Sequence, residues 1–200
     1  MNKLGCASLG VVLAVVAAFI GLVMLGRCLP DAPGTPPVTV HAPSAPLGPL
    51  APPAPLAVPV AGVARESLRD NWGDPRENGL REHHGTDIMA AGGTPVIAAA
   101  PGIVEKLFES ATGGTTVYVR SPDRRWTYYY AHLSGYAPGL HEGQIVKTGD
   151  PLGFVGDTGN AGAGNYHLHF GLARTTPEQH WYQGQDANPF PYLAGKPAAR

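Results

Sequence analysis

The sequence predicts an all-β fold for residues 63–195, a compact antiparallel domain of the β sandwich or barrel-like type. Short apolar runs in this region are separated by turn-forming Pro-Gly, Gly-Gly and Ser-Pro-Asp segments. Within the runs, residues such as Val117 and Val119 alternate with more polar neighbours, as expected for a sheet whose two faces differ. Helical periodicity is hard to find in the same region, which excludes a helical bundle.

Residues 1–28 contain the first expected element, a transmembrane helix that anchors the chain. Residues 7–26 carry no charged side chain, and about 20 apolar residues is the length that crosses a bilayer as a helix. A secretory signal peptide is the alternative, but its apolar core is usually about 7–15 residues long and ends at a small-x-small cleavage site. Met24 and Leu25 stand where those small residues would be needed, so we favour an uncleaved anchor.

Residues 29–62 are expected to form a tether rich in proline and alanine. Eleven of the 21 prolines of the chain lie between Pro30 and Pro59, and Asp31 is the one charged residue of the segment. Proline fixes φ and removes amide donors, so neither a helix nor a sheet is expected to propagate here. An extended polyproline-II segment, at about 3.1 Å per residue, would let the domain reach on the order of 100 Å from a membrane.

Four longer segments are expected to supply the strands of the domain. Each contains apolar runs of strand length, and glycine or proline turns interrupt all but the last segment. Residues 196–200 would form a short tail after the domain. The four segments are TPVIAAAPGIVEKLFES at 94–110, ATGGTTVYVRSPDRRWTYYYAHL at 111–133, QIVKTGDPLGFVGDTGNAG at 144–162 and NYHLHFGLA at 165–173.

Charge and cysteine content exclude several classes of function. Lysine and arginine total 14 and aspartate and glutamate total 15, so the formal net charge is −1. The chain therefore lacks the excess of positive charge that would favour binding to nucleic acid. The two cysteines, Cys6 and Cys28, flank the apolar segment, and residues 63–195 contain none. Any metal in the domain must therefore be held by nitrogen and oxygen ligands.

Two histidine-containing segments are candidates for a metal site. The segment His-His-Gly-Thr-Asp runs from His83 to Asp87, and His-Leu-His runs from His167 to His169. Residues two apart in a strand point the same way, so each segment is expected to present its two end residues on one face. Two such pairs on neighbouring strands supply imidazoles and a carboxylate of the kind that bind a catalytic zinc ion at about 2.0–2.2 Å. His84 would point to the opposite face and is expected to meet solvent.

A third histidine, His132, lies in the segment Tyr-Tyr-Tyr-Ala-His-Leu, and several further motifs accompany it. The motifs are HHGTDI at 83–88, GTPVIAAAPGIV at 93–104, YYAHL at 129–133, GDPLGFVGDTGNAG at 149–162, HLHF at 167–170 and NPFPYL at 188–193. Together they make the chain resemble the lysostaphin-type zinc endopeptidases, a family with a duplicated hybrid motif domain that cuts peptidoglycan cross-bridges. The resemblance covers residues 63–195 with continuous spacing, so it is more specific than a match to one motif.

The resemblance implies a role for each site residue. His83, Asp87 and His169 would be the three zinc ligands, and a fourth position would be kept for water, whose pKa the metal lowers. His132 and His167 would be the catalytic pair beside the metal. An imidazole with a pKa near 6.5 can accept a proton from that water, pass one to a leaving amine, or donate to an oxyanion. Either histidine can fill any of these roles.

The resemblance also implies an activity, the zinc-dependent hydrolysis of peptide bonds in peptidoglycan stem peptides or cross-links. Peptidoglycan would be the partner, the membrane would be contacted through the N-terminal helix, and the domain would face the periplasmic or extracytoplasmic side of the cell envelope. The alternative is a noncatalytic family member that binds cell wall or activates another wall hydrolase, although such members usually lack metal ligands. A structural zinc module is disfavoured because such sites are normally four-coordinate and rich in cysteine.

Overall fold

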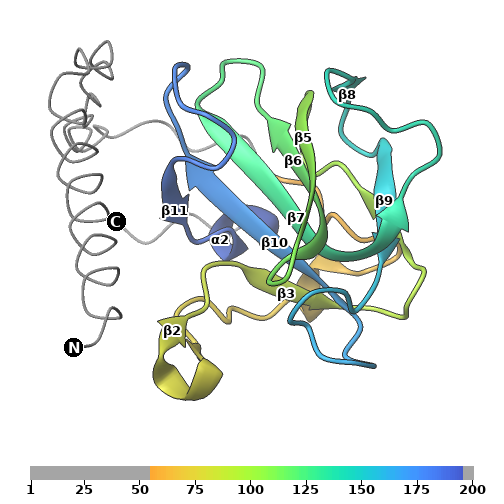
Figure 1. The fold of residues 1–200 in the computed structure, drawn as a ribbon, viewed down its shortest axis with the longest axis vertical. Coiled ribbons are helices and arrows are strands. Elements are labelled where there is room, and N and C mark those ends of the chain that lie inside the picture. Colours follow the sequence, from red (N-terminus) through yellow and green to blue (C-terminus); the bar gives the residue numbers. More distant parts are fainter. Residues whose placement is uncertain (1–54, 196–200) are drawn as a thin grey trace, which may run out of the picture. The chain divides into compact units, whose positions relative to one another are not determined.

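The computed structural model describes residues 55–195, which form an all-β domain, as the sequence predicts (Figure 1). In this part of the chain, nine strands make one antiparallel sheet, and β1 and β2 form a separate two-stranded sheet. The elements are η1 (Arg65–Ser67), β1 (Pro75–Arg76), η2 (Glu77–Gly79), β2 (Arg81–Glu82), β3 (Thr86–Met89), β4 (Pro95–Ile97), β5 (Gly102–Ser110), β6 (Gly114–Arg120), β7 (Trp126–Tyr136), β8 (Ile145–Val146), β9 (Pro151–Val155), β10 (His167–Arg174), β11 (Gln185–Ala187) and α2 (Phe190–Leu193).

Strand β7 explains why the large sheet curls into a half-barrel instead of dividing into the two sheets of a sandwich. This strand of 11 residues pairs with β10 and β6 along its first part, and with β9 from Leu133 to Tyr136. Because β9 also pairs with β4, the sheet turns over at the end of β7 (Figure 1). The barrel-like form of the prediction is therefore the closer description.

The core lies on one face of β6 and β7, where side chains alternate as the sequence predicts. Val117 is fully buried and pairs with Tyr130 of β7. Val119 is also buried and pairs with Tyr128. Tyr129, between the two buried tyrosines, is directed to the opposite face and lines the site described below.

Strand β10 positions the site because it is paired on both sides. Residues 167–170 pair with β3, and residues 169–174 pair with β7. The first half of β10 is therefore flanked by two strands that come from distant parts of the sequence. This arrangement brings the segment at 83–87 next to the segment at 167–169.

The domain begins earlier than the sequence predicts, because residues 55–62, expected in the tether over 29–62, pack into the core. Leu56 and Val60 are each 1 % exposed, and Val60 forms an isolated antiparallel bridge with Val96 of β4. Two backbone amides of the segment also donate hydrogen bonds to β4 and the residues after it, at 2.9 and 3.0 Å. The side chains of Leu56 and Val60 enter the core, while the amides of Ala57 and Ala61 donate to the carbonyl oxygens of Ala99 and Pro95.

The other expectations for the two ends of the chain concern residues outside the described part. The anchor over 1–28, the tether over 29–54 and the tail over 196–200 all lie there. Among residues 55–195, no helix is long and apolar enough to cross a membrane. The N-terminal membrane helix therefore stays a prediction.

Candidate metal centre

The candidate metal centre is built on one pair of neighbouring strands. In the antiparallel pairing of β3 with β10, Asp87 stands directly opposite His169. Directly paired residues share a face of the sheet and have Cβ atoms about 4.5–5.5 Å apart. The Oδ1 atom of Asp87 accordingly lies 3.1 Å from Nδ1 of His169. Strand register therefore brings two of the predicted ligands together.

His83 reaches the same point from outside the strand. Contrary to the prediction of one strand from His83 to Asp87, β3 begins at Thr86 and the chain bends at Gly85. Nδ1 of the buried His83 ring lies 2.7 Å from the carbonyl oxygen of Asn71. Because a carbonyl can only accept, this Nδ1 carries the proton of the neutral ring and Nε2 keeps its lone pair. Nε2 lies 2.9 Å from Oδ1 of Asp87.

The absence of a side chain at Gly85 makes this close approach possible. A Cβ atom at this position would lie 2.5 Å from Cε1 and 2.6 Å from Nε2 of the His169 ring. Both distances are far below the usual separation of non-bonded atoms, about 3.5–4.0 Å. Any residue other than glycine would therefore displace His169 or the bend before β3.

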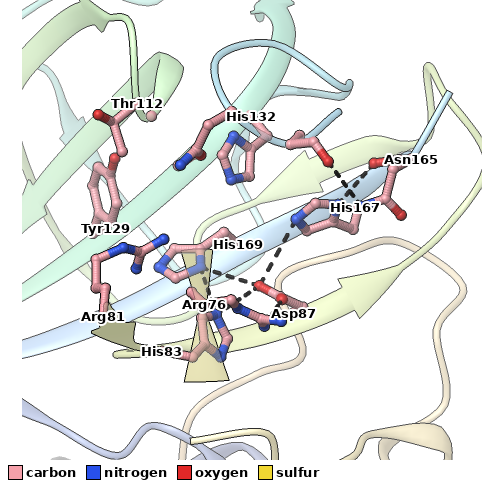
Figure 2. Close-up of a pocket in the computed structure, with 14 residues that line it drawn as sticks. Arg76, Arg81, His83, Asp87, Thr112, Tyr129, His132, Asn165, His167 and His169 are labelled. Atoms are coloured by element: carbon pink, nitrogen blue, oxygen red, sulfur yellow. Dashed lines mark hydrogen bonds and ion pairs between the residues drawn. The ribbon is translucent and has the colours of Figure 1, made fainter. Parts of the chain in front are cut away.

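Three potential ligand atoms converge on one point (Figure 2). Nε2 of His83 lies 2.9 Å from Nδ1 of His169, and Oδ1 of Asp87 is 2.9 Å from the first nitrogen and 3.1 Å from the second. In a tetrahedral zinc site with bonds of about 2.0–2.1 Å, ligand atoms are roughly 3.4 Å apart. Lone pairs and a carboxylate oxygen brought this close repel one another unless a cation or a shared proton lies between them. The donor set and its spacing therefore fit a divalent metal ion.

The protonation states of the site also suit a metal. Burial alone would raise the pKa of the Asp87 carboxyl, but in the metal-free site a proton shared with the His169 and His83 rings outweighs burial and holds that pKa well below its usual range. The second carboxylate oxygen, Oδ2, is paired with Nη2 of Arg76 at 2.6 Å. Burial lowers the pKa of His169. An ionised carboxylate and neutral imidazoles are the forms in which these side chains bind metal ions.

His132 and His167 lie beside the three ligand atoms without joining them. Their ring centroids are 4.9 Å apart, and Nε2 of His167 is 3.8 Å from Oδ1 of Asp87. Each ring places Nδ1 2.8 Å from a backbone carbonyl oxygen, that of Thr158 for His132 and that of Asn165 for His167. In the neutral form of either ring, the proton therefore lies on Nδ1 and Nε2 is unprotonated. Burial and the neighbouring His167 lower the pKa of His132 to about 4, so this ring is neutral at pH 7.

A β-bulge in β7 sets the position of His132. Thr115 of β6 pairs with Leu133 of β7, and Val117 pairs with Tyr130. Two residue steps along β6 therefore correspond to three along β7. The extra residue of β7 breaks the alternation of its side chains. His132 adopts a backbone φ of 63°, a left-handed conformation that costs about 1–3 kcal/mol outside glycine. The rest of the sheet stabilises this strained conformation, as is common for residues at functional sites.

Comparison with known proteins then identifies the family, because residues 81–189 match peptidase family M23. The chain belongs to this family. It is 37 % identical over 133 residues to the L-Ala–D-Glu endopeptidase of Bacillus subtilis, a match that covers 64 % of this chain and 39 % of that protein. It is 34 % identical over 91 residues to the peptidoglycan DD-endopeptidase ShyC of Vibrio cholerae, with 46 % of this chain and 20 % of that protein covered.

A solved structure of the family supports the same conclusion. The catalytic domain of lysostaphin from Staphylococcus simulans is similar with a TM-score of 0.52 at 28 % identity, over 64 % of this chain and 91 % of that domain. The resemblance to lysostaphin-type peptidases is thereby confirmed. The chain spans about two-fifths or less of the length of the two curated relatives, 39 % and 20 %.

The five predicted site residues of this M23 domain all line one cavity of about 280 Å³. A neighbouring groove of about 400 Å³ shares Arg81, Tyr129 and His169 with the cavity and continues past Trp181. Figure 2 shows the histidines and Asp87 gathered in the cavity, with Arg81 and Tyr129 on one side. The site residues that line the cavity are His83, Asp87, His132, His167 and His169.

Two supporting residues of the M23 domain carry no signal that sequence reasoning could use. Asn71 accepts a hydrogen bond from the His83 ring through its backbone oxygen, and one from the backbone amide of Asp87 through Oδ1 at 3.2 Å. Arg76 pairs with the second oxygen of the Asp87 carboxylate. Both lie in short segments without periodicity, so only the folded arrangement reveals that they orient metal-ligand candidates.

His84 meets the expectation that it faces away from the site. Its ring stacks on Trp72 with centroids 5.0 Å apart and an interplanar angle of 16°. Its Nδ1 lies 2.9 Å from Oδ2 of Asp186 on β11. These contacts hold His84 over the neighbouring groove, where it cannot replace His83 as a ligand.

Proposed function

We propose that this chain is a zinc-dependent endopeptidase that hydrolyses peptide bonds in peptidoglycan. The observation that carries the proposal is the convergence of three ligand atoms on one point, with two further histidines beside them. Two imidazoles and one carboxylate form a ligand set of the type that leaves one zinc position open for catalysis. The cysteine-free, three-ligand set also argues against a purely structural zinc site.

Zinc, when bound by His83, Asp87 and His169, would supply Lewis acidity, which polarises a peptide carbonyl and lowers the pKa of a water molecule. The neutral His132 ring, whose Nδ1 donates to a carbonyl, offers Nε2 as the acceptor for a proton of the attacking water. His167 presents its Nε2 from the other side of the same cavity. Once protonated, either ring can donate to the leaving amine or to the oxyanion.

Peptidoglycan is the proposed substrate because of what the relatives act on. The Bacillus subtilis relative is named for cleavage between L-Ala and D-Glu, and the Vibrio cholerae relative is named a peptidoglycan DD-endopeptidase. The first match extends over 133 aligned residues. We therefore favour a bond in the stem peptides or their direct cross-links.

The proposal extends to the place where the enzyme works. Peptidoglycan lies outside the cytoplasmic membrane, so the domain would face the periplasmic or extracytoplasmic side of the cell envelope. Residues 7–26 would act as the membrane anchor, since they carry no charged side chain. Membrane fractionation, followed by protease treatment of intact and permeabilised spheroplasts, tests this part. Recovery of the chain in the soluble cytoplasmic fraction would contradict it.

The central test combines metal analysis with digestion of cell walls. The purified full-length chain is analysed for zinc and is then incubated with purified sacculi, and the released fragments are identified by mass spectrometry. About one zinc per chain and new peptide termini are expected. If neither zinc nor fragments are found, the result would favour the noncatalytic alternative. If zinc is found without fragments, it would favour a structural metal site.

A further inference from the structure

We propose that Arg81 binds a carboxylate of the peptide substrate and so makes this enzyme selective for acidic stem peptides over uncharged cross-bridges. This inference rests on the proposed peptidase function and adds the chemical class of its substrate. It comes from the position, the partners and the charged surroundings of one arginine side chain.

Arg81 stands where a bound peptide must pass. It lies on β2, in the small hairpin of β1 and β2 that is separate from the large sheet. Its side chain lines both the cavity with the ligand cluster and the neighbouring groove. Figure 2 shows it on the same side of the cavity as Tyr129. A peptide whose scissile bond lies at the ligand cluster and which continues into the groove therefore passes Arg81.

The guanidinium of Arg81 is held weakly, in contrast to that of Arg76. Arg76 pairs with Asp87 at 2.6 Å and is committed to the ligand cluster. The two polar contacts of Arg81 within the hairpin, to the Glu77 carboxylate and to the backbone oxygen of Glu82, are both 3.4 Å long. Its side chain is 43 % exposed. A planar guanidinium with such contacts can form two short parallel hydrogen bonds to an incoming carboxylate.

The charges on either side of Arg81 limit where an anionic group can bind. Beyond Arg81, the groove carries Glu82 and Asp186, which disfavour a substrate carboxylate there. On the other side, Arg76 pairs with the carboxylate of Asp87 and offsets its charge. The favourable position for a carboxylate is therefore the junction of the two cavities, next to Arg81. Such a contact would also orient the peptide relative to the ligand cluster.

The chemistry of the proposed substrate supplies such a group. A glutamate residue keeps one carboxylate after its other carboxyl group has formed a peptide bond, whereas a glycine bridge has none. The Bacillus subtilis relative acts beside a D-Glu residue. An arginine at the junction of cavity and groove can therefore distinguish a stem peptide from an oligoglycine bridge by charge.

The first test measures discrimination during cleavage. Two synthetic stem peptides are compared that differ only in whether their glutamate carries a carboxylate or a carboxamide. We expect the wild-type chain to show kcat/KM about tenfold higher for the carboxylate, and Arg81→Gln to lose this preference. Arg69→Gln is the matched control, because Arg69 is exposed and lines neither cavity. A tenfold preference that survives in Arg81→Gln would overturn the proposal.

The second test measures binding without catalysis. The metal-free chain is titrated with the same two peptides by calorimetry, so the readout does not depend on a loaded enzyme. Arg81→Gln should weaken binding of the carboxylate peptide about tenfold and leave the carboxamide peptide unchanged. Discrimination in binding without any cleavage would reject the proposed function but support the role of Arg81. Cleavage without discrimination in either test would reject the role of Arg81 and support the proposed function.

Discussion

His169 pairs with Asp87 of β3 on one side and with Ala131 of β7 on the other. His169 thus links β3, which bears the Asp87 carboxylate, to β7, in which His132 follows Ala131 directly. Side chains alternate with a period of two, so a slip of β10 by one residue would turn His167 and His169 to the opposite face. The register of this three-stranded part of the sheet is therefore a requirement of the site.

Removal of one ligand should abolish metal binding. His169→Ala leaves two of the three converging ligand atoms, and we expect zinc content to fall from about one per chain to near zero, with loss of wall hydrolysis. Elemental analysis of the dialysed protein checks this. His141→Ala is the control, because His141 is exposed and its ring lies 3.0 Å from the backbone oxygen of Gly139 in the same turn, away from the candidate site. Full zinc occupancy in His169→Ala would contradict the ligand assignment.

Replacement of His132, the proposed base, should lower turnover without loss of zinc. His132→Asn suits this test, since asparagine tolerates the left-handed backbone that His132 adopts. We expect zinc content to be retained and turnover to fall by about 10²–10⁴, the usual contribution of a positioned acid or base. Zinc analysis and the rate of sacculus digestion are measured on the same preparation. Loss of zinc in this variant would overturn the division between ligands and catalytic pair.

A methyl group at Gly85 should disturb the site through contact alone. In Gly85→Ala the new Cβ would lie 2.5 Å from the His169 ring, so the ring must move. We expect zinc affinity to fall about 10–100-fold, the range seen when support for a metal ligand is lost. Gly135→Ala is the matched control, because a Cβ there meets nothing within 4 Å. Competition with a chromophoric chelator measures both variants.

The metal-free chain should lose stability in mild acid. Burial and the adjacent His167 lower the pKa of His132 to about 4 in the folded state, from 6.5, and burial lowers that of His169 as well. Between those values the unfolded chain binds more protons than the folded chain, so the free energy of unfolding falls as the pH drops from about 6.5 towards 4. Each histidine contributes at most about 1.4 kcal/mol per pH unit.

Urea unfolding at several pH values tests this expectation. His132→Asn should give a shallower dependence on pH, because one of the two contributing rings is gone. A stability that stays constant from pH 6.5 to 4.5 in the wild-type chain would show that the folded and unfolded states bind protons equally.

Signals that are local in the sequence predicted much of the fold and the site. His167 and His169 stand in an apolar run and flank Leu168, which is fully buried, so the two-residue period predicted their common face. The pattern around Val117 predicted the core face of β6 in the same way. Each of these inferences needed only the alternation along one strand.

The rest depends on contacts between distant residues. His83 lies outside β3, and its ring is placed by the bend at Gly85 and by the carbonyl of Asn71, 12 residues earlier. The position of His132 depends on a bulge, which arises from the pairing of β7 with β6. The bend and the bulge are single irregularities that do not repeat along a strand, so the alternation of side chains in the sequence could not predict them.

The proline-rich segment just before Val63 also affects how the domain can be shortened. Truncation at residue 63 would strip away Leu56 and Val60, two side chains that are each 1 % exposed, and burial of such side chains stabilises by about 1.5–3 kcal/mol apiece. It would also uncover the buried Val96 beneath them. The free energy of unfolding of a small domain is only about 5–15 kcal/mol. A minimal soluble peptidase fragment should therefore start no later than residue 55.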